Sequence, residues 1–314
     1  MILVLFALLT APRADTLDLM FWNLENFFDY RNDSTSVSDA EFSSFGARRW
    51  TKKRFYAKCN SIAKAVLWIS ADKGALPDVI GLAEVENSFV LRRLLQATVL
   101  EKLDYRIVHY ESPDRRGIDV ALLYRSGRLE LLDSKPCHLY EADSSVMRTR
   151  DILLARFIYG GRDIAFLVNH HPSKYGGAKV SGPRRERAVN RLKELADSLL
   201  AVGVDGVVAM GDFNDTPANP IYGQLAPTLE NQALQRFLKG EGTIKFAGKW
   251  ELIDMFFTSS ALQTDGMEII YVPFLQARDK SSLGTKPLRT YSGPRYLGGV
   301  SDHCPVWLQC RLGD

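Results

Sequence analysis

An α/β fold is the class that the amino-acid sequence predicts, and three observations predict it. Short runs of apolar and β-branched residues recur along the chain, segments with a helical period lie between some of them, and the composition, 46% hydrophobic and 25% charged, is that of an ordinary globular protein. The 314 residues exceed the usual domain length, but two-sheet α/β proteins commonly fill such a length around one core. We therefore expect one domain.

Six apolar runs bounded by polar or turn-forming residues predict the strands. They are residues 17–22, 78–83, 118–124, 152–159, 163–168 and 206–210. A further strand over residues 303–310 would separate Cys304 from Cys310 by about 20 Å at ~3.3 Å per residue, too far for a disulfide. We interpret these two cysteines, with Cys59 and Cys137, as buried thiols.

Three segments predict helices. Apolar residues at alternating spacings of four and three line one face between residues 48 and 70: Phe55, Cys59, Ile62, Val66 and Ile69. A second helix should follow Pro183, with four arginines on its solvated faces: Arg184, Arg185, Arg187 and Arg191. The third is expected from Phe89 to Leu103, where Asn87 or Ser88 can provide the N-cap.

Two segments without sustained periodicity, residues 31–46 and 275–301, are expected to be long loops. The apolar stretch after Met1 is far shorter than the roughly 20 residues that span a bilayer, so we expect no stable membrane span. We interpret residues 1–14 as a signal peptide, although Pro12 interrupts the cleavage pattern and a buried first strand is the alternative. This interpretation predicts a periplasmic or secreted protein whose single domain covers residues 15–314.

Five short groups of polar residues follow the ends of predicted strands, where functional sites are commonly built. They are Asn23 with Glu25, Glu84 with Glu86, Asn169–His171, Asp212–Asn214, and Asp302 with His303. In the fourth, Gly211 would let the chain turn, and in extended geometry Asp212 and Asn214 share one face while Phe213 points oppositely into packing. The alternative is that Asp212 only opens an Asx turn.

Carboxylate, amide and imidazole groups together suit phosphoester hydrolysis, which needs a water nucleophile, stabilisation of the charge that develops on phosphorus, and protonation of the leaving oxygen. Hard oxygen ligands favour Mg²⁺ or Mn²⁺, with Ca²⁺ as a further option, and no Cys/His spacing typical of zinc occurs. Asp254, alone in an apolar run, should face a partner, which we expect to be His303. The net charge of +3 neither requires nor excludes nucleic acid.

The segments WNLEN, GLAEVEN, VNHHPSK, MGDFND, LIDMFF and SDHCPV occur in the order seen in the endonuclease/exonuclease/phosphatase superfamily. The resemblance covers nearly the whole chain and is strongest to the bacterial secreted or periplasmic branch. It implies a deoxyribonuclease-like, four-layer fold: a two-sheet α/β sandwich flanked by helices. It also implies a metal-dependent phosphodiester hydrolase, most readily a nuclease acting on DNA or RNA.

Matching residues carry the roles that this resemblance implies. Asn23, Glu84 and Asp302 would lie at the metal, with Glu25 contributing from behind them. Asp212 would orient or deprotonate water, and Asn214 would hold the phosphoryl oxygens.

His303, paired with Asp254, would act as general base or transition-state stabiliser. Of the adjacent histidines, His170 is favoured over His171 as the one that contacts phosphate, because Pro172, Ser173 and Lys174 follow.

Lys174 and Arg116 are expected to contact substrate phosphates, although exposed basic residues are more often simply solvated. Two alternatives remain. One is a phosphatase or sphingomyelinase-like enzyme acting on small or lipid phosphoesters. The other is a non-catalytic binding module that kept the fold.

Overall fold

The structure, a computed structural model, describes residues 16–31, 38, 40–174 and 177–313. The expected signal peptide therefore lies outside the described residues, as does the middle of the expected loop at 31–46. No helix in the described part of the chain is long and apolar enough to cross a membrane.

Two mixed sheets form the centre of the molecule. The first has the strand order β13 (Leu262–Thr264), β19 (Val306–Leu312), β1 (Thr16–Phe27), β2 (Val79–Val85), β4 (Asp119–Arg125), β3 (Tyr105–His109), with β14 (Glu268–Ile269) also on β19. The second has the order β5 (Glu130–Cys137), β6 (Ile152–Tyr159), β7 (Arg162–His170), β8 (Gly206–Asp212), β12 (Asp254–Thr258), β9 (Glu230–Asn231).

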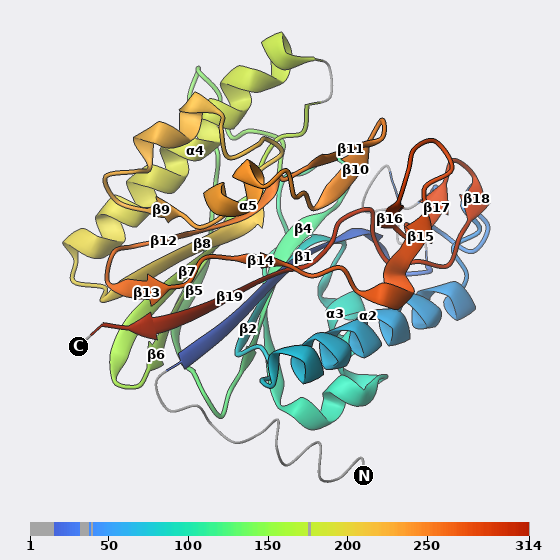
Figure 1. The fold of residues 1–314 in the computed structure, drawn as a ribbon, viewed down its shortest axis with the longest axis horizontal. Coiled ribbons are helices and arrows are strands. Elements are labelled where there is room, and N and C mark those ends of the chain that lie inside the picture. Colours follow the sequence, from blue (N-terminus) through green and yellow to red (C-terminus); the bar gives the residue numbers. More distant parts are fainter. Residues whose placement is uncertain (1–15, 32–37, 39, 175–176, 314) are drawn as a thin grey trace.

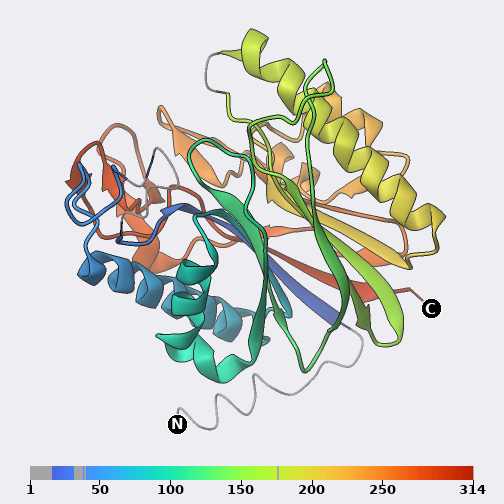
Figure 2. The ribbon, with the colours of Figure 1, turned by 180° about the vertical axis from the view of Figure 1, so that it is seen from behind.

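Helices cover the outer faces of both sheets, as Figures 1 and 2 show from opposite sides. The longer helices are α2 (Lys52–Lys73) and α3 (Ser88–Gln96) over the first sheet and α4 (Ala178–Ala201) over the second. Shorter ones are η1 (Val99–Leu103), η2 (Pro220–Gln224), α5 (Leu234–Leu238) and η3 (Pro273–Leu275). The expected four-layer sandwich is confirmed.

All six predicted strands are present. They could be recognised in the sequence because a strand that is buried on both faces consists mostly of apolar residues. Every residue of β8 is buried, for example, and Phe21 of β1 and Phe166 of β7 lie in the core between the sheets. The strand β5 carried no such signal because it is an edge strand with five exposed residues and Pro136. All four cysteines are free and buried, as expected.

The helix predictions need three corrections. The third helix is split into α3 and η1, with Asn87 as N-cap accepting from the backbone of Phe89 and Val90. The second begins at Ala178, so Pro183 lies within α4, where proline cannot donate the backbone hydrogen bond to the preceding turn. Arg185 is buried in an ion pair with Asp215 instead of being solvated.

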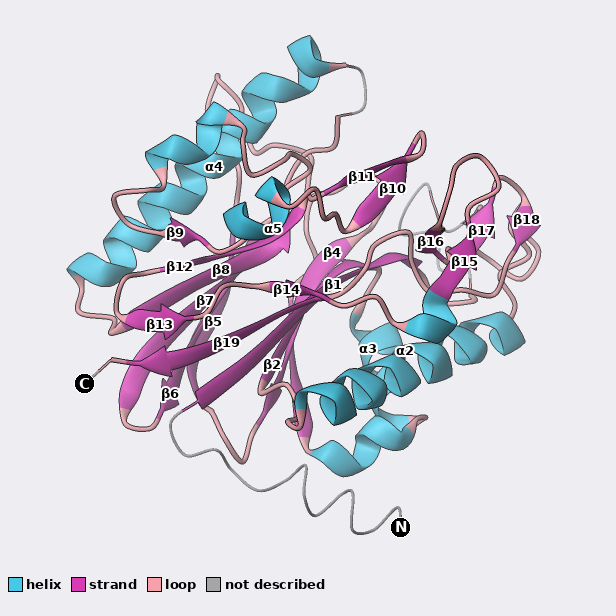
Figure 3. Cartoon of the chain, in the orientation of Figure 1, coloured by secondary structure: helices cyan, strands magenta, loops and turns pink. Residues whose placement is uncertain are grey.

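The expected loop at residues 275–301 contains two small hairpins. They are β15 (Gln276–Arg278) with β16 (Thr285–Pro287), and β17 (Tyr291–Ser292) with β18 (Arg295–Tyr296). A third hairpin pairs β10 (Ile244–Phe246) with β11 (Lys249–Glu251). Figure 3 shows β15–β18 beside one end of α2, where the Arg54 guanidinium lies 4.3 Å from the centre of the Tyr296 ring.

Candidate active site

Four strand ends meet at one edge of the sandwich. The strands β1 and β2 are parallel, β7 and β8 are parallel, and β12 begins opposite the end of β8, with Asp254 paired to Asp212. Register shifts occur where β1 and β2 end. Four non-glycine residues at this edge adopt positive φ, a costly conformation that clusters at functional sites: Glu25, Asn26, Glu84 and Asn214.

Asp212 lies at the centre of the polar groups at this edge. Its Oδ2 accepts a 3.0 Å hydrogen bond from Nδ2 of Asn23 and lies 3.6 Å from Nε2 of His170 and 3.8 Å from Nε2 of His303. Burial, with the neighbouring Asp254 carboxylate, raises the pKa of Asp212 to about 7. The carboxyl group is therefore poised to exchange a proton near neutral pH.

Asp254 and His303 form the expected pair. Nδ1 of His303 lies 2.8 Å from Oδ2 of Asp254, and both side chains are buried. Burial lowers the pKa of His303, but the charge and hydrogen bond of Asp254, helped by Asp212, raise it well above its ordinary value. The ring is therefore held as an imidazolium with Nε2 turned toward Asp212.

The two adjacent histidines face different surroundings. His170 directs Nε2 toward Asp212 and lies 4.0 Å from Oε1 of Glu84. His171 instead packs edge-on against Phe213 and has Nε2 3.3 Å from Oδ1 of Asn169. The structure thus places His170 among the candidate catalytic groups. Burial and the charge of nearby Arg150 lower the pKa of His170 well below its ordinary value, so this ring is neutral.

The geometry around GDFN differs from the expected extended strand. The strand ends at Asp212, whose Oδ1 accepts from the backbone of Asn214 in an Asx turn, and Nδ2 of Asn214 donates to the backbone oxygen of His171. Phe213 points into packing as expected. Gly211 makes no turn: it lies within β8, where a Cβ would come within 2.3 Å of the backbone oxygen of Asn169.

The four residues predicted to bind metal have different hydrogen-bond and ion-pair partners. Asn23 contacts Asp212, and Glu84 lies within reach of His170. Oδ2 of Asp302 pairs with Arg289 at 3.0 Å. The carboxylate of Glu25 points away, toward Nη2 of Arg289 at 2.7 Å and the backbone of Thr290.

Two carboxylates, Asp212 and Asp254, lie close enough together to face one cation, with His303 beside them. One ligand atom from each of Asp212, Asp254 and His303 lies within 4.8 Å of the others. Oδ1 of Asp254 is buried without a hydrogen-bond partner, and Asp212 is protonated more readily than an ordinary aspartate because of burial. Two desolvated carboxylates with an unsatisfied oxygen fit a hard divalent cation, which would compensate their charge.

The two predicted phosphate contacts lie in different places. Nη2 of Arg116 is 3.9 Å from Oε1 of Glu84, and its side chain is about half exposed at the rim of the site. Lys174 instead pairs with Glu251 at 3.4 Å and Asp215 at 3.7 Å, and no contact joins it to the Asp212 cluster in the described part of the chain.

Arg150 was not predicted, because nothing in the stretch before β6 marks it. It is buried and donates to the backbone oxygens of His170 and His171 and to Oδ2 of Asp114. The other oxygen of Asp114 accepts from the backbone of Arg116. Arg150 therefore connects the strand end that carries His170 to the loop that carries Arg116.

Replacing Asp114 by Ala should lower the free energy of unfolding by about 3 kcal/mol, because the buried Arg150 loses its counter-charge. It should also raise KM for a phosphoester, since the turn that holds Arg116 is lost. Urea unfolding and steady-state kinetics measure the two effects. Asp143, which holds a similar but exposed turn through Ser145, is the control: Asp143→Ala should change neither strongly. If Asp114→Ala and Asp143→Ala had equal effects on the free energy of unfolding and on KM, Arg150 would not connect the His170 strand end to the Arg116 loop through Asp114.

Comparisons with known proteins address the family and the fold. Residues 18–311 match the family model described as "Endonuclease/Exonuclease/phosphatase family". No curated protein matches the sequence.

Solved structures with similar folds include three proteins whose names indicate different activities. The human Nocturnin catalytic domain with bound sulfate is 17% identical, with a TM-score of 0.61, covering 96% of this chain and 95% of that one. A mannosyl-6-phosphatase of Bacteroides thetaiotaomicron is 16% identical, with a TM-score of 0.60 and 94% and 99% covered. TDP2 of D. rerio, complexed with a single-strand DNA product, is 13% identical, with a TM-score of 0.57 and 94% and 99% covered. At these identities the likeness concerns the fold.

Proposed function

Because the chain belongs to the endonuclease/exonuclease/phosphatase family and is a phosphoesterase of that family, we propose that it hydrolyses phosphodiester bonds in DNA or RNA with the help of a divalent cation. One observation carries the proposal. A buried carboxylate, Asp212, is surrounded at one strand end by the amide of Asn23 and the imidazoles of His170 and His303. These are the groups that such a reaction requires.

Each side chain has a role that follows from its state. Asp212, with a pKa near 7, accepts the proton of the attacking water. The imidazolium of His303, fixed by Asp254, stabilises negative charge on the phosphoryl oxygens and gives its proton to the leaving oxygen. The neutral His170 donates an uncharged N–H hydrogen bond, and Asn23 orients Asp212 through its amide.

A bound Mg²⁺ or Mn²⁺ supplies Lewis-acid stabilisation of the phosphoryl oxygens and of the leaving oxygen. Asp254 would offer it the unpartnered Oδ1, with Glu84 and Asn23 at the neighbouring strand ends, which leaves Asp212 free to accept the proton. Arg116, half exposed beside Glu84, can contact a substrate phosphate.

Purified protein with Mg²⁺, Mn²⁺ or Ca²⁺ tests the proposal against plasmid DNA, RNA, sphingomyelin, a sugar phosphate monoester and bis(4-nitrophenyl) phosphate. We expect cleavage of nucleic acid and of the chromogenic diester, and loss of both with chelator. Cleavage of only the monoester or the lipid would replace the nuclease assignment with one of the small-substrate alternatives. A protein that binds nucleic acid but cleaves none of these substrates would be a non-catalytic module.

A further inference from the structure

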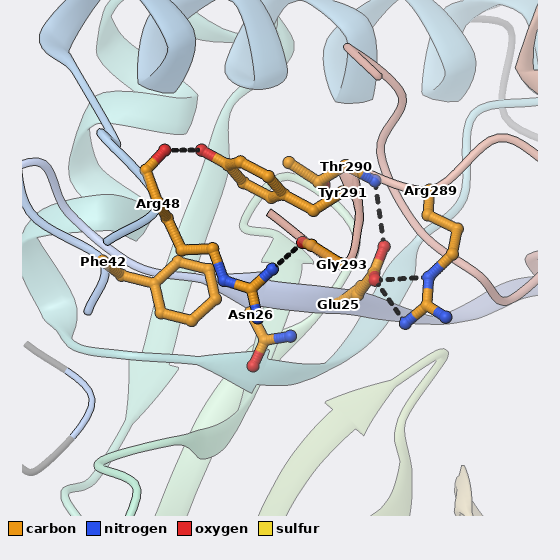
Figure 4. Close-up of a pocket in the computed structure, with 8 residues that line it drawn as sticks. All are labelled: Glu25, Asn26, Phe42, Arg48, Arg289, Thr290, Tyr291 and Gly293. Carbon is orange, nitrogen blue, oxygen red and sulfur yellow. Dashed lines mark hydrogen bonds and ion pairs between the residues drawn. The ribbon is translucent and has the colours of Figure 1, made fainter. Parts of the chain in front are cut away.

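A cavity of about 110 Å³ adjoins the candidate active site at the end of β1. Figure 4 shows the residues that line it: Glu25, Asn26, Phe42, Arg48, Arg289, Thr290, Tyr291 and Gly293. They come from the end of β1, from the segment before α2 and from the β17 region. None of the catalytic steps above uses this cavity, which we call the Arg48–Arg289 cavity.

A hydrogen bond and two ion pairs join this cavity directly to the candidate active site. The backbone of Asn26 donates to Oε2 of Glu84. Nη2 of Arg289 bridges Glu25 inside the cavity and Asp302 beside His303, at 2.7 and 3.0 Å. A group in the cavity therefore lies next to any substrate that contacts Glu84 and His303.

Arg48 presents a guanidinium that is already fixed in place. Its Nε donates to Glu41 at 2.6 Å, Nη1 donates to the backbone oxygen of Gly293, and Cζ lies 5.7 and 5.4 Å from the ring centres of Phe42 and Tyr291. Among the described residues, Nη2 has no hydrogen-bond partner. A guanidinium held in this way binds an anion with little further loss of side-chain entropy.

Arg289 offers a second set of donors. Its Nε and Nη2 are used by Glu25 and Asp302, whereas Nη1 has no hydrogen-bond partner in the described part of the chain. Glu25 is the single acid in the lining, and Nζ of the buried Lys58 lies 2.6 Å from its backbone oxygen. Around the cavity, Arg48, Arg289 and Lys58 are matched by Glu41, Glu25 and Asp302, so net charge does not decide what binds. An anion would be held by the directed guanidinium donors that lack partners among the described residues, Nη2 of Arg48 and Nη1 of Arg289.

We propose that the Arg48–Arg289 cavity is an anion subsite that binds the phosphate next to the scissile one in a phosphodiester chain. The inference rests on the proposed function, since a neighbouring phosphate exists only in a substrate with several phosphates. The guanidinium N–H groups of Arg48 and Arg289 that have no partner among the described residues match phosphate oxygens in charge and geometry. The subsite makes the enzyme select a nucleotide chain over an isolated phosphoester.

Binding tests the subsite without turnover. In the full-length Asp212→Asn protein with Mg²⁺, calorimetry should give thymidine 3′,5′-bisphosphate an affinity about tenfold higher than either thymidine monophosphate, the size expected for one charge-assisted contact. Adding Arg48→Gln should remove the difference. Arg92→Gln is the matched control, because Arg92 lies on α3, bonds Ser88 and does not line this cavity. Equal affinities in the Asp212→Asn protein would overturn the subsite.

Kinetics separate this inference from the proposed function. In the otherwise unchanged enzyme, the dinucleotides pTpT and TpTp are compared with TpT, and at least one should be cleaved about tenfold more efficiently through a lower KM. Cleavage of TpT with no preference for either longer substrate would reject the subsite alone. No cleavage of any diester would reject the proposed function, and the binding experiment would still decide the subsite.

A second variant guards against a folding defect in Arg48→Gln, which thermal unfolding would reveal. Asn26→Asp is isosteric, tolerates the positive φ of residue 26, and adds a negative charge to the cavity. It should bring the affinity ratio between the bisphosphate and the monophosphates close to one. Retention of the full ratio would contradict an anion subsite.

Discussion

Replacing Asp212 by Asn should reduce kcat/KM for a phosphodiester on the order of 10³-fold, because the side chain can no longer accept a proton or compensate a cation. The new amide N–H group at position 212 can also face the N–H groups of Asn23 and His303, which then lose their acceptor. Initial rates with bis(4-nitrophenyl) phosphate and Mg²⁺ measure the effect. Asp212→Ala should abolish metal-dependent cleavage while the fold is retained, which circular dichroism checks.

Asp205 provides a control at the opposite end of the same strand. It is partly exposed and accepts from the backbone of Asp163, far along β8 from the candidate catalytic residues. Asp205→Asn should therefore stay within about twofold of the unmodified enzyme, as surface substitutions away from special features usually do. Undiminished cleavage by Asp212→Asn or Asp212→Ala would remove Asp212 from the catalytic group and with it the proposed mechanism.

Replacing Asp254 by Asn should lower kcat by about 10²-fold or more, because it removes the carboxylate that holds the positive charge on His303 and that would also face a bound cation. Asp254 holds the pKa of His303 well above its ordinary value. Without that carboxylate, His303 loses its proton at lower pH. The basic limb of the pH–rate profile should therefore move toward acidic pH.

A double-mutant cycle checks that Asp254 and His303 act as a unit. Their side chains are 2.8 Å apart and both are buried, so the effects of Asp254→Asn and His303→Gln on kcat should be far from additive. Additive losses would show that the two residues act independently. An unchanged pH profile in Asp254→Asn would contradict the role assigned to the imidazolium.

Much of the fold could be predicted because its strands are covered on both faces. The apolar runs that became β1, β2, β4, β6, β7 and β8 had to be apolar to lie between layers. The apolar pattern was weaker in elements with an exposed face, and β5 was therefore not predicted. The adjacent α3 and η1 were predicted as a single helix. Local pattern reports burial, and these segments are only partly buried.

The sequence by itself determined which chemical groups stand at the strand ends, including Asn23, Glu84, His170, Asp212 and His303. Only the tertiary structure decided how they meet. It placed His170 rather than His171 beside Asp212, turned Glu25 away toward Arg289, and positioned Arg150 behind both histidines. The physical reason is that side-chain direction at these bulged, positive-φ strand ends depends on strand register and on partners more than 100 residues away, such as Asp212 for Asn23.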